Sequence, residues 1–294
     1  MKYAFIEAHQ AEFPISLMCR VLKIARSGYY KWLTQPASER ERVNAALTEV
    51  IRAAHAASRQ TYGSPRLYRE LKAQGLPGGR HRVARLMRRA GIAVRRRRAY
   101  KITTTSHHHQ PIAPNVLNRE FTATRPNEKW LTDITYVPTR EGWLYLAVVL
   151  DVFSRLIVGW ALSTTLDQSL VLAALRMALV HRCPPSGLLH HSDRGSQYAA
   201  LAYQRLLKAH NVTVSMSGTG NCYDNAMLES FFATPKAECV TATYATRAEA
   251  KHAIVDYIEV WYNRQRRHSA LDYRSPVAFE EAYHRGLSLS TKVG

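Results

Sequence analysis

The second half of the chain carries an ordered series of apolar runs, and their lengths and spacing restrict the fold more than any other feature. The run "EKWLTDITYVPT" (128–139) is rich in β-formers, and residues 142–163 read as two further strands that turn around Asp151–Ser154. The next segment, 167–182, is apolar nearly all round, as expected for a helix packed on a sheet. The remaining expected elements are a strand at 187–192, a helix at about 197–210 and a strand at 212–216. This order predicts an α/β domain with a mixed five-stranded sheet and covering helices.

Two acidic residues stand at unusual places in these strands. Asp133 lies in the middle of the first strand, where burying an unpaired carboxylate among apolar neighbours costs on the order of several kcal/mol. Asp193 directly follows the fourth strand, in "LLHHSDRGSQY" (188–198). The order of elements is that of a ribonuclease-H-like domain. In this topology the first and fourth strands are neighbours, so we expect the two carboxylates to meet at one sheet edge.

A third acid is expected from the segment "NCYDNAMLESFFATPKAE" (221–238). Asp224 or Asn225 can cap a helix there, and Glu229 then points away from the apolar face in the second turn. Three carboxylates that converge without a basic partner repel one another unless divalent cations bind between them. We therefore predict that Asp133, Asp193 and Glu229 are both the catalytic and the metal-binding residues, with two cations held roughly 4 Å apart for chemistry at phosphorus.

Charge separates the chain into two unlike parts. The net charge is +19, and residues 1–120 hold 23 Lys and Arg against 7 Asp and Glu, a net of +16. Residues 121–294 hold the remaining 18 and 15, a net of only +3. This imbalance favours a front half that binds a polyanion, although a merely soluble basic surface is the alternative.

The segment 62–92 of the basic half reads as a helix-turn-helix. Ser64 and Pro65 are expected to begin a helix that Gly75 ends, and a second helix is expected to end at Gly91. The second helix has an apolar face formed by Val83, Leu86, Met87 and Ala90. Its opposite face is formed by Arg80, His81, Arg82, Arg85, Arg88 and Arg89. We expect these five arginines to contact DNA.

Other segments give weaker indications. Residues 13–33 fit a small helical pair broken at Gly28, whose aromatic residues either stack on bases or form a core. The tetra-arginine Arg95, Arg96, Arg97 and Arg98 is expected to follow DNA phosphates. His107–His109 read as part of a solvated loop rather than a metal site. Asp151 reads as structural, and Asp167 as the N-cap of the helix that follows it. His191 reads either as a packing residue or as one that supports the site or contacts DNA.

The C-terminal part is expected to hold one last helix and a basic tail. A capping box from Thr246 to Glu249 opens that helix, which directs an apolar face to the core. The basic residues that follow read either as DNA contacts or as a solvated basic end: Arg264, Arg266, Arg267 and His268.

These features divide the chain and exclude some classes of protein. The expected parts are a helical region (1–50), a helix-turn-helix domain (51–100), a linker (101–120), a catalytic core (121–240) and a C-terminal helix with a basic tail (241–294). The four cysteines contain no CxxC pair, which argues against a disulfide framework or a cysteine zinc site. No apolar run approaches the ~20 residues of a membrane helix, so we expect a cytoplasmic, nucleoid-associated protein without a membrane partner.

The complete set of motifs resembles a known family. Asp133, Asp193 and Glu229, with 35 residues between the last two, resemble the D,D-35-E triad of retroviral integrases and bacterial insertion-sequence transposases. "HSDRGSQY", "GNCYDNAMLESFF" and "YNRQRRHSALDYRSP" resemble the signature of OrfB-type transposases, and the resemblance runs from about residue 15 to 283. It implies a ribonuclease-H-like core, Mg²⁺ or Mn²⁺, and cleavage and joining at the terminal inverted repeats.

The resemblance also implies roles for two neighbouring residues. Lys236 matches a basic residue that contacts DNA near the site, and its spacing from Glu229 places both on one helix face. Position 235 is Pro where related sequences carry Leu, so we expect the helix to end near Thr234 or to kink. The segment "SGTGN" (217–221) also lacks the basic residues often found there.

The function expected from the sequence is that of a transposase. It would bind inverted repeats and target DNA as a homo-oligomer, alone or with an upstream-frame OrfA partner or fusion. One alternative is a catalytically impaired copy that acts as a DNA-binding repressor. Another is a tyrosine recombinase, because His191 to Arg194 fits HxxR, but that motif belongs on a helix and here it follows a strand.

Overall fold

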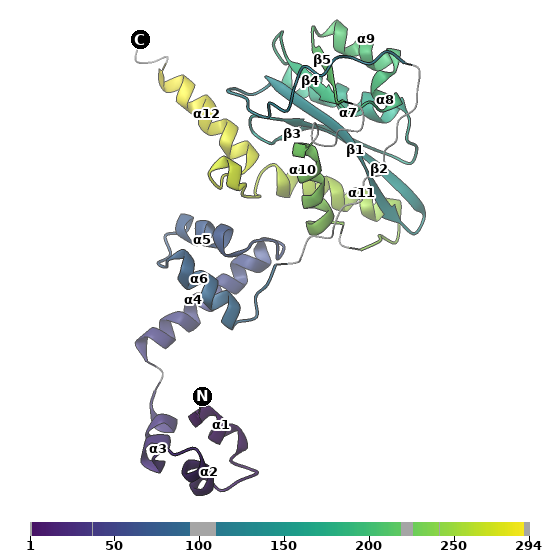
Figure 1. Cartoon of the computed structure of the whole chain (residues 1–294). Helices are drawn as coiled ribbons and strands as arrows, with labels where there is room; N and C mark the ends of the chain where they lie inside the picture. The colour runs from purple at the N-terminus through teal and green to yellow at the C-terminus, as the bar shows by residue number, and fades with distance from the viewer. Residues whose placement is uncertain (1, 37, 95–109, 219–225, 241, 291–294) are drawn as a thin grey trace.

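The computed structural model describes residues 2–36, 38–94, 110–218, 226–240 and 242–290. Figure 1 shows three bodies in succession along the chain: a small helical unit at the N-terminus, a second helical unit, and an α/β domain. None of the helices within these ranges is long and apolar enough to cross a bilayer.

The α/β domain contains the predicted mixed five-stranded sheet, with the strand order β3-β2-β1-β4-β5. The strands are β1 (Lys129–Thr139), β2 (Gly142–Asp151), β3 (Ile157–Ser163), β4 (Leu189–Ser192) and β5 (Thr213–Met216). The first three are antiparallel, whereas β1 pairs with β4, and β4 with β5, in parallel. This is the topology of a ribonuclease-H-like core, and it makes the first and fourth strands neighbours.

Helices cover both faces of this sheet (Figure 1). On one face lie α7 (Gln168–Arg182), α8 (Ser196–Ala199) and α9 (Leu201–Ala209). On the other lie α10 (Ala226–Glu238), α11 (Arg247–Val255) and a π-helical segment (Asp256–Tyr262). The single helix expected at about 197–210 is interrupted at Ala200, whose backbone is extended with φ −59° and ψ 136°. Asp167 caps α7 as expected, because its side chain accepts a hydrogen bond from the Ser169 N–H at 2.8 Å.

Gly159 of β3 marks the closest approach of α7 to the sheet. A Cβ atom at this position would lie 2.3 Å from the carbonyl oxygen of Ala174 and 2.7 Å from the Cβ of Ala178. Neither atom can move without shifting the helix backbone. The absence of a side chain at residue 159 therefore sets the distance between helix and sheet.

We expect Gly159→Ala to lower the free energy of unfolding by about 3 kcal/mol, since the added methyl group overpacks a rigid helix–sheet contact. Chemical denaturation of the purified chain measures this change. Gly286→Ala is the matched control, because no atom lies within 4 Å of its added Cβ. An equal effect of both substitutions would contradict the packing argument.

The second helical unit is formed by α4 (Glu39–Ala57), α5 (Ser64–Ala73) and α6 (Arg80–Arg89). The predicted helix-turn-helix corresponds to α5 and α6, whose apolar faces pack together with Leu47 and Ile51 of α4. Position 50, where we expected a boundary, therefore lies inside a helix that belongs to this unit. The helix α5 is capped by Gly63 rather than by Ser64, and Pro65 lies in its first turn.

The N-terminal unit is formed by α1 (Lys2–His9), α2 (Ile15–Val21) and α3 (Arg26–Thr34) around a small core of their own. The expectation of a break at Gly28 is wrong, because Gly28 lies inside α3 and the break falls at residues 22–25. A Cβ at Gly28 would lie 2.6 Å from the Tyr3 hydroxyl oxygen, so a glycine lets α3 pack closely on α1. Of the aromatic residues, Tyr29 is buried while Tyr30 and Trp32 remain exposed.

The C-terminal part differs from the prediction of one last helix. Thr246 caps α11 through the Glu249 N–H at 3.0 Å, but the Glu249 carboxylate accepts from the Ala245 N–H rather than closing a capping box. A further helix, α12 (Pro276–Ser290), follows a 3-10 turn at Ser269–Leu271. The sequence interpretation assigned no helix after Trp261, and α12 is held by contacts distant in sequence, among them Phe279 and Tyr283 against Phe153.

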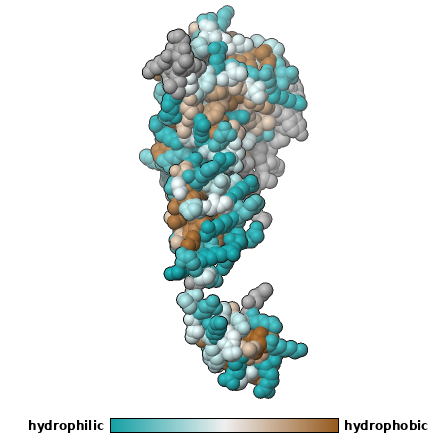
Figure 2. Space-filling model, turned by 90° about the vertical axis from the view of Figure 1, so that its left-hand side faces the viewer, coloured by the Kyte–Doolittle hydropathy of each residue, from teal (hydrophilic) through white to brown (hydrophobic). Residues whose placement is uncertain are grey.

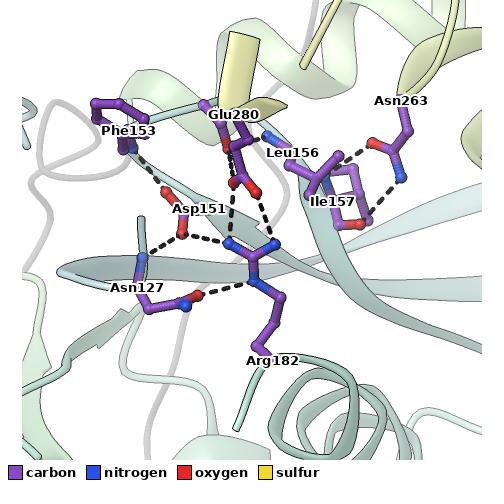
Figure 3. A network of polar contacts seen from close by, with 9 residues as sticks. Asn127, Asp151, Phe153, Leu156, Ile157, Arg182, Asn263 and Glu280 are labelled. Atoms are coloured by element: carbon purple, nitrogen blue, oxygen red, sulfur yellow. Dashed lines mark hydrogen bonds and ion pairs between the residues drawn. The ribbon is translucent and has the colours of Figure 1, made fainter. Parts of the chain in front are cut away.

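A buried polar network attaches α12 to the sheet (Figure 3). Arg182 of α7 donates two hydrogen bonds to Glu280 of α12, at 2.7 and 3.0 Å, and lies 3.8 Å from the Asp151 carboxylate. Asp151 is fully buried and accepts from the backbone N–H groups of Asn127 and Phe153. The expectation that Asp151 has a structural role agrees with these contacts.

Burial raises the pKa of Asp151 to about 6. Because this folded-state pKa lies above the ordinary value, the protonated carboxyl favours folding, and its contribution is lost as the pH rises through 6. We expect Asp151→Asn to gain about 2–3 kcal/mol in the free energy of unfolding relative to wild type between pH 4 and pH 7. Denaturation at a series of pH values measures this difference. Asp272→Asn, at an exposed turn, should run parallel to wild type.

Candidate catalytic carboxylates and DNA-binding surface

The structure brings Asp133 and Asp193 together at one edge of the sheet. Leu131 of β1 pairs with His191 of β4 in parallel register. Asp133 and Asp193 each follow two residues later, so the same register places them side by side. Both are half-buried. Burial, followed by the charge of Asp193, raises the pKa of Asp133 well above its ordinary value.

Local hydrogen bonds and one buried tyrosine hold this pair. Asp133 accepts from the Ile134 N–H at 2.7 Å, and Asp193 accepts from the Gly195 N–H at 2.9 Å. Tyr198 of α8 is fully buried behind them, and after burial the charges of the two aspartates are the next causes that raise its pKa. Tyr198 thus lies close to the pair on the helix side of the sheet.

Glu229 lies in the first turn of α10, half-buried, and burial raises its pKa. Its charge is one of the smaller influences that raise the pKa of Asp133, and the charge of Lys236 acts in the opposite direction. Glu229 and Lys236 are thus both close enough to act on Asp133 from α10. This arrangement agrees with their expected position on one helix face.

Pro235 does not end α10 near Thr234, contrary to one of the two outcomes we expected. The helix continues to Glu238, and the Pro235 carbonyl accepts from the N–H groups of Cys239 and Val240 at 2.8 and 2.9 Å. Pro235 itself is buried against the sheet. Its packing compensates for the hydrogen bond that its missing N–H withholds from Phe231. The expected caps Asp224 and Asn225, and most of "SGTGN", lie outside the described residues.

The donor chemistry of the three acids suits a hard divalent cation. Carboxylate oxygens are the ligands that Mg²⁺ and Mn²⁺ prefer, and the charges of Asp193 and Glu229 both raise the pKa of Asp133, a repulsion that a bound cation would relieve. Within the described ranges, however, no three His, Cys, Asp or Glu side chains are already gathered closely enough to hold a metal. The aspartate pair is formed, and Glu229 lies near it without completing a cage.

His191 holds β4 to β5 just before the second aspartate. Ser215 accepts from the Val116 and Leu117 N–H groups at 2.9 and 3.1 Å, so its own hydroxyl proton is left for His191 Nδ1 at 2.8 Å. The ring proton of a neutral imidazole then lies on Nε2 and donates to Ser217 at 3.1 Å. His191 is fully buried, which excludes direct contact with DNA. The same bonds fix residues 116 and 117, from the expected linker, on the sheet.

If the chain has the strand-cleavage activity that its sequence resemblance implies, Gly195→Ala should lower that activity at least tenfold while changing the free energy of unfolding by about 1 kcal/mol or less. The backbone at residue 195, with φ −58°, accepts alanine, but the added Cβ would lie 3.0 Å from the Asp193 Oδ1 and 2.9 Å from the Gln197 Oε1. Relief of these contacts turns the carboxylate away. A paired cleavage and denaturation series checks this, and unchanged cleavage would contradict it.

The basic face of α6 is largely available to a ligand. Arg80, Arg85, Arg88 and Arg89 are exposed. Arg82 is half-buried and donates a hydrogen bond to Asn44 of α4 at 2.9 Å, so it braces the unit. Arg95 to Arg98 and His107–His109 lie outside the described residues.

The C-terminal arginines have partners that the sequence did not indicate. Arg266 is buried and donates to the Glu238 carboxylate at 2.7 and 2.8 Å, so the expectation of a DNA contact is wrong for this residue. Arg267 donates to Glu70 of α5 at 2.7 Å, and its backbone N–H donates to the Tyr62 hydroxyl. These contacts dock the helix-turn-helix unit on the α/β domain. Arg264 remains exposed.

Comparisons with known proteins agree with this architecture. The HTH-like domain family matches residues 42–100, and two integrase core domain families match residues 123–222 and 210–276. Transposase InsF of insertion sequence IS3A from Escherichia coli (strain K12) is 46% identical over 283 residues, covering 95% of this chain and 98% of InsF. An uncharacterised 31 kDa protein of insertion element IS600 from Shigella sonnei is 46% identical over 269 residues, covering 91% and 99%.

Solved structures resemble the chain more distantly. A simian T-cell lymphotropic virus intasome bound to a PP2A regulatory subunit has a chain that is 13% identical, with a TM-score of 0.45, covering 78% of this chain and 73% of that one. The HTLV-2 integrase catalytic core domain in complex with magnesium is 15% identical, with a TM-score of 0.39, covering 54% and 99%.

An HTH-like unit followed by a ribonuclease-H-like integrase core with paired aspartates defines a class, the insertion-sequence transposases of the retroviral-integrase type. Within that class, the 46% sequence identity to InsF over most of both chains identifies the family. The chain belongs to the IS3 family of transposases, to which InsF belongs.

Proposed function

We propose that this transposase binds the terminal inverted repeats of its own insertion sequence and catalyses DNA strand cleavage followed by strand transfer. The observation that carries the proposal is the register of β1 and β4, which sets Asp133 of the central strand beside Asp193, just past the end of β4. Glu229 of α10 supplies the third carboxylate. These three side chains would hold one or two Mg²⁺ or Mn²⁺ ions.

Such ions, when bound, lower the pKa of an attacking water or hydroxyl and neutralise charge that develops at phosphorus. The chain's own residues do the rest. Tyr198 closes the site from behind and excludes water from the helix side. Lys236, half-buried on α10, contacts the DNA phosphate next to the site.

The helix-turn-helix unit positions the substrate. The exposed arginines of α6 bind phosphates and groove edges of the element end, and the Arg267–Glu70 ion pair keeps that unit at a fixed place relative to the aspartates. Two ends must be joined in one event, so the active form is a homo-oligomer on DNA. An upstream-frame OrfA partner or fusion takes part in assembling it.

The test is strand cleavage and joining on linear DNA that carries both ends of the element, with Mg²⁺, with Mn²⁺ or with EDTA. The chain is assayed alone and fused to the product of the upstream reading frame. Metal-dependent nicking at the repeat ends, followed by joining through the 3′-hydroxyl, is expected in at least one form. Tight end-specific binding without chemistry in both forms would instead favour a repressor.

The repressor alternative draws its support from Pro235, and the continuation of α10 through that residue weakens it. A proline that leaves Lys236 near Asp133 gives no reason for an inactive site.

A further inference from the structure

The N-terminal unit, residues 2–34, contains a second helix-turn-helix that lies outside the HTH-like match at 42–100. Figures 1 and 2 show this unit standing apart from the rest of the chain at the end of a narrow connection. It has its own core of Ile6, Met18, Cys19 and Tyr29. A unit of this size that is tied so loosely to the rest of the chain contributes little to the main core.

The turn between α2 and α3 has the length found in a DNA-binding helix-turn-helix. The two helices are joined by four residues, 22–25, which is the turn length of that motif. Lys23 in this turn adopts the left-handed region with φ 52°, a conformation that reverses the chain tightly. The Ile24 N–H donates back to the Cys19 carbonyl at 3.0 Å and closes the end of α2.

The burial pattern of the two helices also fits the motif. Met18 and Cys19 of α2 and Tyr29 of α3 are buried where the helices cross, and Leu22 and Ile24 of the turn are half-buried beside them. The side of α3 that is turned away from this crossing is therefore free for a ligand. That side carries Arg26, Ser27, Tyr30, Lys31 and Thr34, all of which are exposed.

The charge of this surface suits DNA. Residues 14–36 contain four cationic side chains, Arg20, Lys23, Arg26 and Lys31, and no acidic one. The two acids of the unit belong to other segments, Glu7 to α1 and Glu12 to the loop that follows it, and the charge of Glu7 acts on the buried Tyr29. An exposed tyrosine between cations provides an apolar edge for a base or a thymine methyl group.

We propose that α3 is a second recognition helix, which enters the major groove of duplex DNA next to the stretch bound by α6. Arg26 and Lys31 contact phosphates, and Tyr30 contacts base edges. The inference rests on the proposed function for the identity of the DNA, which is the element end. It adds an outer contact zone and makes recognition bipartite.

Another surface of the same unit could bind a second copy of the chain. Leu17 and Val21 of α2 are exposed, at 45% and 70%, and lie one turn apart. They are on α2, whereas Arg26 and Lys31, the cationic side chains that face away from the helix crossing, are on α3. The two uses are separable by substitution, and the experiment below distinguishes them.

The experiment compares DNA binding by the full chain and by three double variants. The probes are a 50-base-pair duplex from one end of the insertion sequence that encodes this chain and a scrambled duplex of equal composition. The test variant is Arg26→Glu with Lys31→Glu. The matched control, with the same change of charge at exposed sites of the α/β domain, is Lys208→Glu with Lys251→Glu. The third variant, Arg85→Glu with Arg88→Glu, disrupts α6.

We expect the α3 variant to bind the end duplex at least tenfold more weakly and to lower the slope of log K against log salt by about 2, one for each lost phosphate contact. Its hydroxyl-radical footprint should lose the outer zone and keep the α6 zone. Tyr30→Ala should reduce the preference for the end over the scrambled duplex without changing the salt slope. The control should change binding less than twofold.

Two outcomes would overturn the inference while leaving the proposed function intact. One is an α3 variant with wild-type affinity and footprint beside an α6 variant that binds weakly. The other is an α3 variant whose only change is loss of self-association in sedimentation, which would assign this unit to protein contact. Absence of end-specific binding by the wild-type chain and by its OrfA fusion would refute the proposed function instead.

Discussion

Asp193→Asn is expected to lower strand cleavage and strand transfer by about 1,000-fold or more, because loss of one cation-binding carboxylate removes several kcal/mol of transition-state stabilisation. The amide is nearly isosteric and can still accept from the Gly195 N–H, which lies 2.9 Å from the carboxylate. Folding and DNA binding should therefore persist. The measurements are cleavage on end-bearing DNA and binding to the same duplex.

Asp272→Asn is the matched control for this substitution. Asp272 is exposed and adopts the left-handed region with φ 51°, which asparagine also accepts. Its activity should stay within a factor of two of wild type. If Asp193→Asn retained more than a tenth of the wild-type rate, the aspartate pair would not be the catalytic centre.

Arg266→Ala should reduce the free energy of unfolding by about 3–5 kcal/mol, since it leaves the buried Glu238 carboxylate without its bidentate partner. Arg266 is 2% exposed, and Tyr257 donates a further hydrogen bond to Glu238 at 2.8 Å. Arg264→Ala, two residues away at an exposed position, should change the same quantity by about 0.5 kcal/mol or less. Denaturation of both variants tests the difference.

The result also bears on the tail as a DNA contact. If Arg266→Ala proved as stable as Arg264→Ala but bound DNA more weakly, the buried pair would be a poor description of this region. If the Arg266→Ala variant is unstable but its folded fraction binds DNA normally, Arg266 is not a DNA contact. Its role is then to hold α10, which carries Glu229 near one end and Glu238 at the other.

The fold of the α/β domain followed from the sequence because its information is local and periodic. Strand-length apolar runs, one helix apolar all round and their order along the chain were sufficient for the five-stranded sheet and for placing Asp133 near Asp193. The apolar face of α6 was predictable for the same reason, with its 3.6-residue period visible in Val83, Leu86 and Met87.

Only the tertiary structure decided which charged residues are buried partners. Arg264, Arg266 and Arg267 are indistinguishable as a basic run, but one is exposed, one pairs with Glu238 and one with Glu70. Their partners lie far away in sequence, and a local sequence pattern cannot predict contacts between residues so far apart.

The same reason explains the other differences. Pro235 remains inside a helix because its ring packs against the sheet, and α12 is held by Arg182 and Phe153, which are distant in sequence. The structural role of His191 could be assigned only from its hydrogen bonds to Ser215 and Ser217, which belong to a neighbouring segment. Local periodicity determines elements and their order, whereas burial and long-range pairing, which depend on the assembled fold, determine the role of each polar side chain.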